Sequence, residues 1–409
     1  MNQGYIAAFI RGLCIDLTGK PQIVVYEAAK EGKIPAAAMG LEIGSGENEE
    51  SAAASIRTAY VAWEKAAGGS TGGAGEGKAL LPGCAALCVG GKPEALFWID
   101  GDLDSARKRL AEKNDAPRTE SIVVPGAAVS PAERAAIVKN RIALVTGGAQ
   151  GIGEEIVRNL TAGGALVFIA DLNLEGAQKL ADQINAAEKR TAALALAVNV
   201  SDELSVEALC NAVAESAGGL DLCVSNAGVL KAGSVLEQEL ADFKFVTDIN
   251  YTGFFIISKF AGRLLKAQHR TALRWKTDII QINSKSGLEG SNKNGAYSGG
   301  KFGGIGLVAS FAMELVEYNI KVNAICPGNF LDGPLWSHPE KGLFVQYLKT
   351  GKVPGAKTTA DVRAFYESKV PMKRGCTGKD LARAIYYIVE QEYETGQAIP
   401  VTGGQVMLH

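Results

Sequence analysis

The chain has 409 residues, of which 47% are hydrophobic and 21% are charged, as is typical of an ordinary globular protein. A formal net charge of −2 argues against nucleic acid or another polyanion as a partner. No apolar run is long enough to span a bilayer, and Arg11 and Asp16 interrupt the apolar start of the chain, so we expect a cytoplasmic protein without a membrane partner.

Residues 1–137 are expected to form a small α/β module that precedes the main domain. Its patterns predict helices over residues 5–17, 22–31, 49–67 and 104–113, and a β-hairpin made of residues 84–89 and 94–99. The Gly-rich stretch 68–77 and most of residues 114–140 are predicted to be linkers, with a short helix near Pro131. The module's role is open, and an interaction or oligomerisation domain is the expectation.

Two features of this module resemble ligand sites without supporting one. The run from Gly72 to Lys78 has phosphate-loop spacing, but Ala79 stands where a Ser or Thr is required, and no strand precedes the run. Cys84 and Cys88 have no second cysteine pair and no nearby histidine, so we expect no metal site. Residues 1–137 contain no histidine at all, which argues against a metal-dependent aldolase.

Residues 138–409 are expected to form a doubly wound, Rossmann-like parallel α/β sheet, because strand and helix patterns alternate. Two of the predicted helices, near 240–268 and 296–317, are long, and residues 329–370 are expected to form a substrate lid. The strands are predicted near residues 141–146, 165–170, 194–198, 220–225, 278–283, 320–325 and 397–401.

A strand, a glycine turn and a helix follow one another from Arg141 onward, an arrangement that binds dinucleotides. Gly147, Gly151 and Gly153 allow a tight turn and a close approach to a pyrophosphate at the helix N-terminus. The next predicted strand ends at Asp171, 18 residues after Gly153, where a carboxylate can bind the ribose hydroxyls. These residues predict a nicotinamide dinucleotide site.

A tyrosine and a lysine four residues apart, Tyr297 and Lys301, lie in a predicted helix and therefore on one face of it. A nearby ammonium favours the phenolate, so Tyr297 is expected to exchange a proton with an alcohol near neutral pH. The pair alone is common on solvated helix surfaces. Two candidate serines lie upstream of Tyr297, Ser284 at 13 residues and Ser286 at 11.

Together, Thr146-Gly-x-x-x-Gly-x-Gly, Asn226-Ala-Gly228, Ser284 and Tyr297-x-x-x-Lys301 resemble the short-chain dehydrogenase/reductase family. The resemblance implies NAD as the cofactor and a homo-oligomer, a dimer or tetramer. It makes Tyr297 the general acid/base, Lys301 its activator, Ser284 the residue that stabilises the reacting oxygen, and Asn250 the residue that positions the lysine. A helix-kink role for Asn250 is the alternative. The residues implied to bind the cofactor are Gly147, Gln150, Gly151, Ile152, Gly153, Asp171, Asn199, Val200, Asn226, Ala227, Gly228, Tyr297, Lys301, Pro327 and Gly328.

Several positions depart from the family pattern. Ser225 replaces an asparagine, Asn199 stands where many relatives have aspartate, and Thr402 replaces a common aspartate. Asp332 stands where a threonine usually follows Pro327-Gly328, which leaves open how the nicotinamide carboxamide is held.

Within the family, residues 139–409 are similar to the sorbitol-6-phosphate 2-dehydrogenase group, most of all in Gln281-Ile-Asn-Ser-Lys-Ser-Gly287 and Thr402-Gly-Gly-Gln-Val-Met407. The resemblance implies hydride transfer between NAD and a sugar alcohol or its phosphate. We expect Lys285, Lys293 and, less strongly, His338 to bind a substrate anion, next to Ser284 and Tyr297 at the reacting carbon. The alternatives are another keto sugar or hydroxy acid as substrate, or a non-catalytic NAD-binding scaffold.

Overall fold

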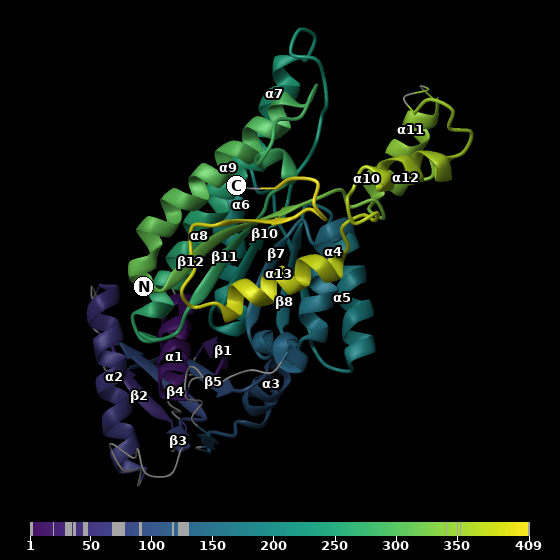
Figure 1. Ribbon diagram of the computed structural model, residues 1–409. Helices are drawn as coiled ribbons and strands as arrows, with labels where there is room; N and C mark the ends of the chain where they lie inside the picture. The colour runs from purple at the N-terminus through teal and green to yellow at the C-terminus, as the bar shows by residue number, and fades with distance from the viewer. Residues whose placement is uncertain are drawn as a thin grey trace.

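The computed structural model describes residues 3–18, 20–28, 35, 38–43, 48–67, 78–89, 92–116, 118–121, 131–340, 342–349, 351 and 353–407. Figure 1 shows a large sheet between two layers of helices, a smaller N-terminal module beyond one end of its strands, and a helical arm beyond the other end. None of the helices described is long and apolar enough to cross a membrane.

The large sheet has seven strands, all of them parallel, and confirms the predicted doubly wound α/β fold. The chain crosses from β9 back to β10, on the other side of β7, so that the strand order reverses beside β7. From one edge to the other the strands are β13 (Ala398–Val401), β12 (Ile320–Pro327), β11 (Thr277–Ile282), β10 (Leu222–Ser225), β7 (Ile142–Thr146), β8 (Leu166–Asp171) and β9 (Ala193–Ala197). Such a reversal places a ligand crevice at the carboxyl ends of the strands.

Helices cover both faces of this sheet, and the inner strands β7, β11 and β12 are therefore buried along their whole length. One face carries α4 (Gly151–Ala162), α5 (Leu174–Glu188) and α13 (Gly378–Glu390). The other face carries α6 (Glu203–Ala217), α8 (Gly253–His269) and α9 (Gly295–Leu315). The predicted helix 240–268 is divided into α7 (Leu240–Thr247), a π-helical turn over Asp248–Thr252, and α8.

The N-terminal module contains a four-stranded mixed sheet in the order β1-β5-β4-β2. Its strands are β1 (Ile23–Ala28), β2 (Met39–Glu42), β4 (Cys84–Val89) and β5 (Lys92–Asp100), and β3 (Lys78–Leu81) pairs with β6 (Arg118–Ser121). Its helices are α1 (Gln3–Thr18), α2 (Glu49–Ala66) and α3 (Leu103–Glu112), and a 3₁₀ turn spans Pro131–Val138. The predicted β4–β5 hairpin and the three helices that correspond to α1, α2 and α3 are confirmed.

The predicted helix over residues 22–31 is wrong. Residues 23–28 form strand β1, which pairs antiparallel with β5 in the register Val25 with Trp98. Ile23, Val24, Val25 and Tyr26 have high β-propensity, and a long-range partner strand outweighed the helix-start signal of Pro21. The predicted linker over 114–140 also contains strand β6, whereas the Gly-rich linker 68–77 lies outside the described residues.

The module and the large domain share one hydrophobic core. Ile23, Val25, Leu96 and Trp98, on one face of the module's sheet, belong to the same buried cluster as Leu209 and Val213 of α6. Helix α1 packs against both α6 and α8. The module is therefore seated on the domain through its sheet and through α1.

A buried charge pair lies at the centre of this contact. The Arg11 guanidinium of α1 donates two hydrogen bonds to the Asp221 carboxylate, at 2.7 and 3.1 Å, and both side chains are fully buried. Asp221 precedes β10, and it also accepts hydrogen bonds from the Ile142 N–H at 2.7 Å and the Trp275 indole at 2.9 Å. Arg11 thus pairs with a carboxylate that joins the starts of two central strands.

The predicted lid forms the helical arm of Figure 1, which projects from the carboxyl end of β12. It comprises α10 (Pro334–Ser337), α11 (Leu343–Lys349) and α12 (Thr359–Ser368). The arm has its own small core, in which Trp336 packs on the Phe344 and Tyr366 rings with centroids 5.4 and 4.8 Å apart. Its function as a lid stays a prediction.

Candidate active site

The predicted cofactor residues come together at the carboxyl edge of the large sheet, because each follows a parallel strand. The glycine loop follows β7, Asp171 ends β8, Asn226 follows β10, and Gly328 follows β12. This is the edge at which open α/β sheets bind nucleotides.

The glycine loop has the close backbone approach that a dinucleotide cradle requires. Gly147 has a φ of +62°, in the left-handed region, and a Cβ there would lie 2.8 Å from the Ala227 Cα. A Cβ on Gly153 would lie 2.0 Å from the Gly147 carbonyl oxygen. Helix α4 starts at Gly151, and Gln150 makes no side-chain capping bond to its first N–H groups. These donors suit a pyrophosphate, so the residues fit a dinucleotide.

Asn226 holds the shape of this loop. Its side-chain Nδ2 donates to the carbonyls of Thr146 and Gly147, at 3.0 and 2.9 Å, and its own N–H donates to the Thr146 hydroxyl at 3.1 Å. The sequence did not show this function, because the two segments are about 80 residues apart. Asn226 therefore supports the cradle from beneath.

At the adenosine end, Asp171 has its carboxylate at the edge of the loop. It accepts from the Ala149 N–H at 3.0 Å and from the Asn173 N–H at 2.9 Å. Asn199 Oδ1 accepts from the Ser201 hydroxyl at 2.8 Å, while Val200 beside it is buried against Gly253. The Ile152 side chain, in the first turn of α4, is half-buried.

Helix α9 carries Tyr297 and Lys301, and strand β11 leads into Ser284. The Ser284 side chain lies close enough to the Tyr297 hydroxyl to favour its phenolate. The Lys301 Nζ donates to the Ile282 carbonyl at 2.8 Å and lies 5.6 Å from the centre of the Tyr297 ring. The structure thus brings Ser284, Tyr297 and Lys301 together.

Burial changes the acid–base properties of this group. It raises the pKa of Tyr297 above its ordinary value, although the Ser284 side chain acts to lower it. Burial also lowers the pKa of Lys301 to about 8. In the protein alone, burial therefore outweighs the depression of the Tyr297 pKa that we expected from the lysine.

Asn250 lies in the π-helical turn between α7 and α8, so the helix-kink interpretation describes its backbone correctly. Its side chain accepts from the Val229 N–H and donates to the Val229 carbonyl, both at 2.8 Å. A Cβ on Gly228 would lie 3.2 Å from the Asn250 Oδ1 and 3.8 Å from the Lys301 Nζ. Asn250 therefore lies close to the lysine, and its positioning role stays a prediction.

Pro327 ends β12 and Gly328 follows it, where a Cβ on Gly328 would lie 3.0 Å from the Thr402 carbonyl oxygen, just after the last strand. Asp332, which replaces the expected threonine, forms an ion pair with Arg363 of α12 at 2.7 Å. Asp332 thus joins the base of the arm to its last helix.

The predicted anion-binding lysines lie beside the catalytic group. Lys285 is half-buried in the 3₁₀ turn after Ser284, and Lys293 is exposed in the loop before α9 with a φ of +55°. In the described part of the chain no ion pair involves either lysine. His338 lies further out, at the end of α10, where its Nδ1 accepts from the Glu340 N–H.

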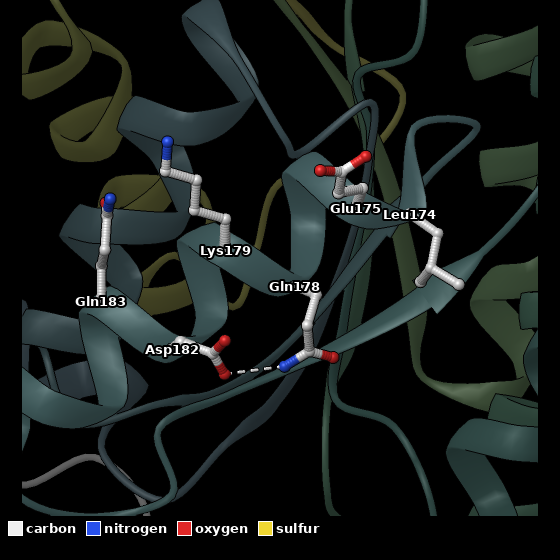
Figure 2. A pocket seen from close by; sticks show the side chains of 6 residues that line it. All are labelled: Leu174, Glu175, Gln178, Lys179, Asp182 and Gln183. Carbon is white, nitrogen blue, oxygen red and sulfur yellow. Dashed lines mark hydrogen bonds between the residues drawn. The ribbon is translucent and has the colours of Figure 1, made fainter.

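A shallow surface hollow follows the outer side of α5 (Figure 2). All of its lining side chains come from that one helix, and Gln178 and Asp182 are hydrogen-bonded to each other at 2.8 Å. None of the predicted site residues lines it. The hollow is therefore not part of the candidate active site.

These features belong to a known class. A model of the short chain dehydrogenase family matches residues 141–338, and the chain belongs to this family. Sorbitol-6-phosphate 2-dehydrogenase of Escherichia coli K12 is 37% identical over 271 residues, which cover 66% of this chain and 99% of that protein. Meso-2,3-butanediol dehydrogenase of Serratia marcescens is 30% identical and covers 59% of this chain and 96% of its own length.

A solved structure is similar over the same share of the chain. The crystal structure of sorbitol-6-phosphate 2-dehydrogenase from Erwinia amylovora is 40% identical, with a TM-score of 0.60, and the match covers 65% of this chain and all of that one. About a third of this chain therefore has no counterpart in that structure. The fold, the family and the oxidoreductase class are established by these matches.

Proposed function

We propose that this protein is an NAD-dependent dehydrogenase of a sugar alcohol or sugar alcohol phosphate, of the sorbitol 6-phosphate/fructose 6-phosphate type. The observation that carries the proposal is the grouping of Ser284, Tyr297 and Lys301, the last two on one helix face, beside a dinucleotide cradle. The similarity to sorbitol-6-phosphate 2-dehydrogenases supports the substrate class.

The cradle would hold NAD through the α4 N-terminus and Asp171, and the bound cofactor would accept or supply the hydride. Tyr297 takes the proton of the substrate hydroxyl in oxidation and returns it in reduction. Ser284 donates a hydrogen bond to the reacting oxygen. Lys301 places positive charge beside the tyrosine and so favours its phenolate.

The test is a screen of NAD reduction across sugar alcohols, each with and without a phosphate. The proposal expects the highest kcat/KM with a polyol or polyol phosphate that is oxidised at a secondary carbon. A hydroxy acid as the best substrate would instead support the alternative substrate class. The scaffold alternative requires NAD binding without turnover of any of these compounds.

NAD is expected to be preferred over NADP. The Asp171 carboxylate would repel a 2′-phosphate, and Gly148 in the loop offers no cationic side chain to neutralise it. Measuring kcat/KM with both cofactors checks this, and a higher value with NADP would contradict it. The variant Asp171→Asn is expected to narrow the difference, because it removes the repelling charge.

Replacing Lys285 by alanine is expected to raise KM for a phosphorylated polyol at least tenfold, about 1.4 kcal/mol. The variant would lose the charge-assisted contact that this half-buried lysine beside Ser284 is proposed to make with the phosphate. KM for the unphosphorylated polyol should not change. Lys293→Ala, at an exposed position, serves as the comparison and should raise this KM by less. If the best substrate carries no phosphate, the proposed anion site is wrong.

A homo-oligomer is also part of the proposal. Phe255 of α8 and Phe302 and Met313 of α9 are large apolar side chains with exposures of 45%, 47% and 82%. Exposed large apolar side chains on neighbouring helices favour a protein–protein contact surface. We expect light scattering to give a dimer or tetramer, and Phe302→Glu to shift it towards the monomer. A wild-type monomer would contradict this expectation.

A further inference from the structure

Asn283 is a fully buried polar residue at the end of β11, next to Ser284. It is 3% exposed, and its neighbour Ile282 and the strand residues Ile279 and Ile280 are apolar. A buried carboxamide in such surroundings is costly unless each of its polar atoms has a partner.

The carboxamide contacts the backbones of two catalytic residues. Its Oδ1 accepts from the Ser284 N–H at 2.8 Å, and its Nδ2 donates to the Lys301 carbonyl at 2.9 Å. Nδ2 also donates to Gln281 Oε1 at 2.7 Å. Asn283 thus connects the strand end that carries Ser284 to the helix that carries Tyr297 and Lys301.

The turn after Ser284 packs closely against the Asn283 carboxamide and against helix α9. A Cβ on Gly287 would lie 2.1 Å from the Asn283 Oδ1 and 3.1 Å from the Lys301 carbonyl oxygen. The turn is therefore closed around the carboxamide and against α9. A shift of Asn283 would move both the turn and the helix.

We propose that Asn283 is a positioning residue that sets the place of the Ser284 hydroxyl relative to Tyr297 and Lys301. It does not touch the reacting atoms. The expected effect of Asn283 on kcat rests on the proposed dehydrogenase function. The acid–base part depends only on the effect of the Ser284 hydroxyl on Tyr297, which acts to lower the pKa of that tyrosine.

The kinetic test is Asn283→Ala in the full chain. We expect kcat to fall by about 10- to 100-fold, because misplacement by about an ångström has effects of this size. The Kd for NAD should stay within about twofold of the wild-type value, since the cradle is built from other elements. Gln281→Met is the matched control: Gln281 is 2% exposed and contacts Asn283, but the structure gives it no hydrogen bond to a catalytic residue. It should lower stability and leave kcat within about threefold.

The second test does not require turnover. Carbon-13 labelling of the tyrosine ring and NMR titration would report the pKa of Tyr297, with its signal identified by its loss in Tyr297→Phe. Asn283→Ala should raise that pKa in the same direction as Ser284→Ala, because both variants lose the aligned hydroxyl. Gln281→Met should not shift it.

Two results would overturn the proposal. One is an unchanged Tyr297 pKa in Asn283→Ala when Ser284→Ala raises it. The other is a shift of equal size in Gln281→Met, which would reveal general loosening of the core. If the wild type oxidises no polyol, the proposed substrate class fails, while the titration still decides the role of Asn283.

Discussion

Replacing Tyr297 by phenylalanine is expected to lower kcat by about 10²- to 10⁴-fold, the usual contribution of a general acid/base. Phenylalanine keeps the aromatic ring that lies beside Lys301 and loses only the hydroxyl, which lies near Ser284. The Kd for NAD, measured by fluorescence titration, should stay within about twofold of wild type. A variant that keeps more than about a tenth of wild-type turnover would remove Tyr297 from its proposed role.

Tyr386→Phe is the control for this variant. Tyr386 is a buried tyrosine whose hydroxyl donates to the Asn159 carbonyl at 2.8 Å, away from the predicted site residues. Its loss should cost about 1 kcal/mol of stability and leave kcat unchanged. A pH series adds a second check. Because Tyr297 must be deprotonated to accept a proton, alcohol oxidation should rise with pH, and ketone reduction should fall.

The large sheet was predictable because each of its strands is short, apolar and set between helical patterns. Ile142 to Thr146 are all buried, as a run of this kind suggests for a parallel strand with two covered faces. The same local order places Gly147, Asp171 and Ser284 after strands. Since parallel strands end at one edge, the sequence alone could indicate which residues would meet there.

The module was harder to predict because its partners are distant. Ile23 to Ala28 became a strand through pairing with Lys92–Asp100. Strand β6 exists through pairing with β3, in which Thr119 lies opposite Leu80, 39 residues earlier. Local propensity does not reveal such pairings. The loop-supporting bond of Asn226 and the double contact of Asn283 were missed for the same reason. Each joins backbone atoms whose proximity follows only from the fold.

Arg11→Met is expected to destabilise the whole chain by about 3–5 kcal/mol, because it leaves a buried carboxylate without its main partner. Asp221 is fully buried, and although burial acts to raise its pKa, the Arg11 guanidinium and the other donors hold the pKa below its ordinary value. The free energy of unfolding should be measured by urea titration. Of the chain's four tryptophans, Trp98 lies in the module and Trp275 in the large domain, and replacing Trp63 and Trp336 by phenylalanine leaves one fluorescence reporter on each side.

The pH dependence of this loss has a definite sign. In the wild type, the depressed pKa of Asp221 gives stability that is present above about pH 4 and is lost as the pH falls through the folded pKa. In Arg11→Met, burial should raise that pKa instead. The variant's deficit should therefore be smallest in acid and grow as the pH rises towards neutrality.

A double-mutant cycle separates the ion pair from the packing around it. Arg11→Met with Asp221→Asn removes both charges and keeps one of the two oxygens that accept from the Ile142 N–H and the Trp275 indole, so its cost should be less than the sum of the single variants. Arg57→Met is the control. Arg57 also bridges the module to the large domain, through the Thr271 carbonyl, but its side chain is 35% exposed, and its loss should cost at most about 1 kcal/mol.

The shared core predicts that both tryptophans report one transition, shifted together in Arg11→Met, because Ile23 and Trp98 are buried in the same cluster as α6. Two separate transitions in the wild type would mean that the module is held on the domain only loosely. An Arg11→Met variant no less stable than Arg57→Met would show that the buried pair does not anchor it. The expected result makes residues 3–18 part of the same folding unit as the large domain, since their arginine neutralises the carboxylate that joins the starts of β7 and β10.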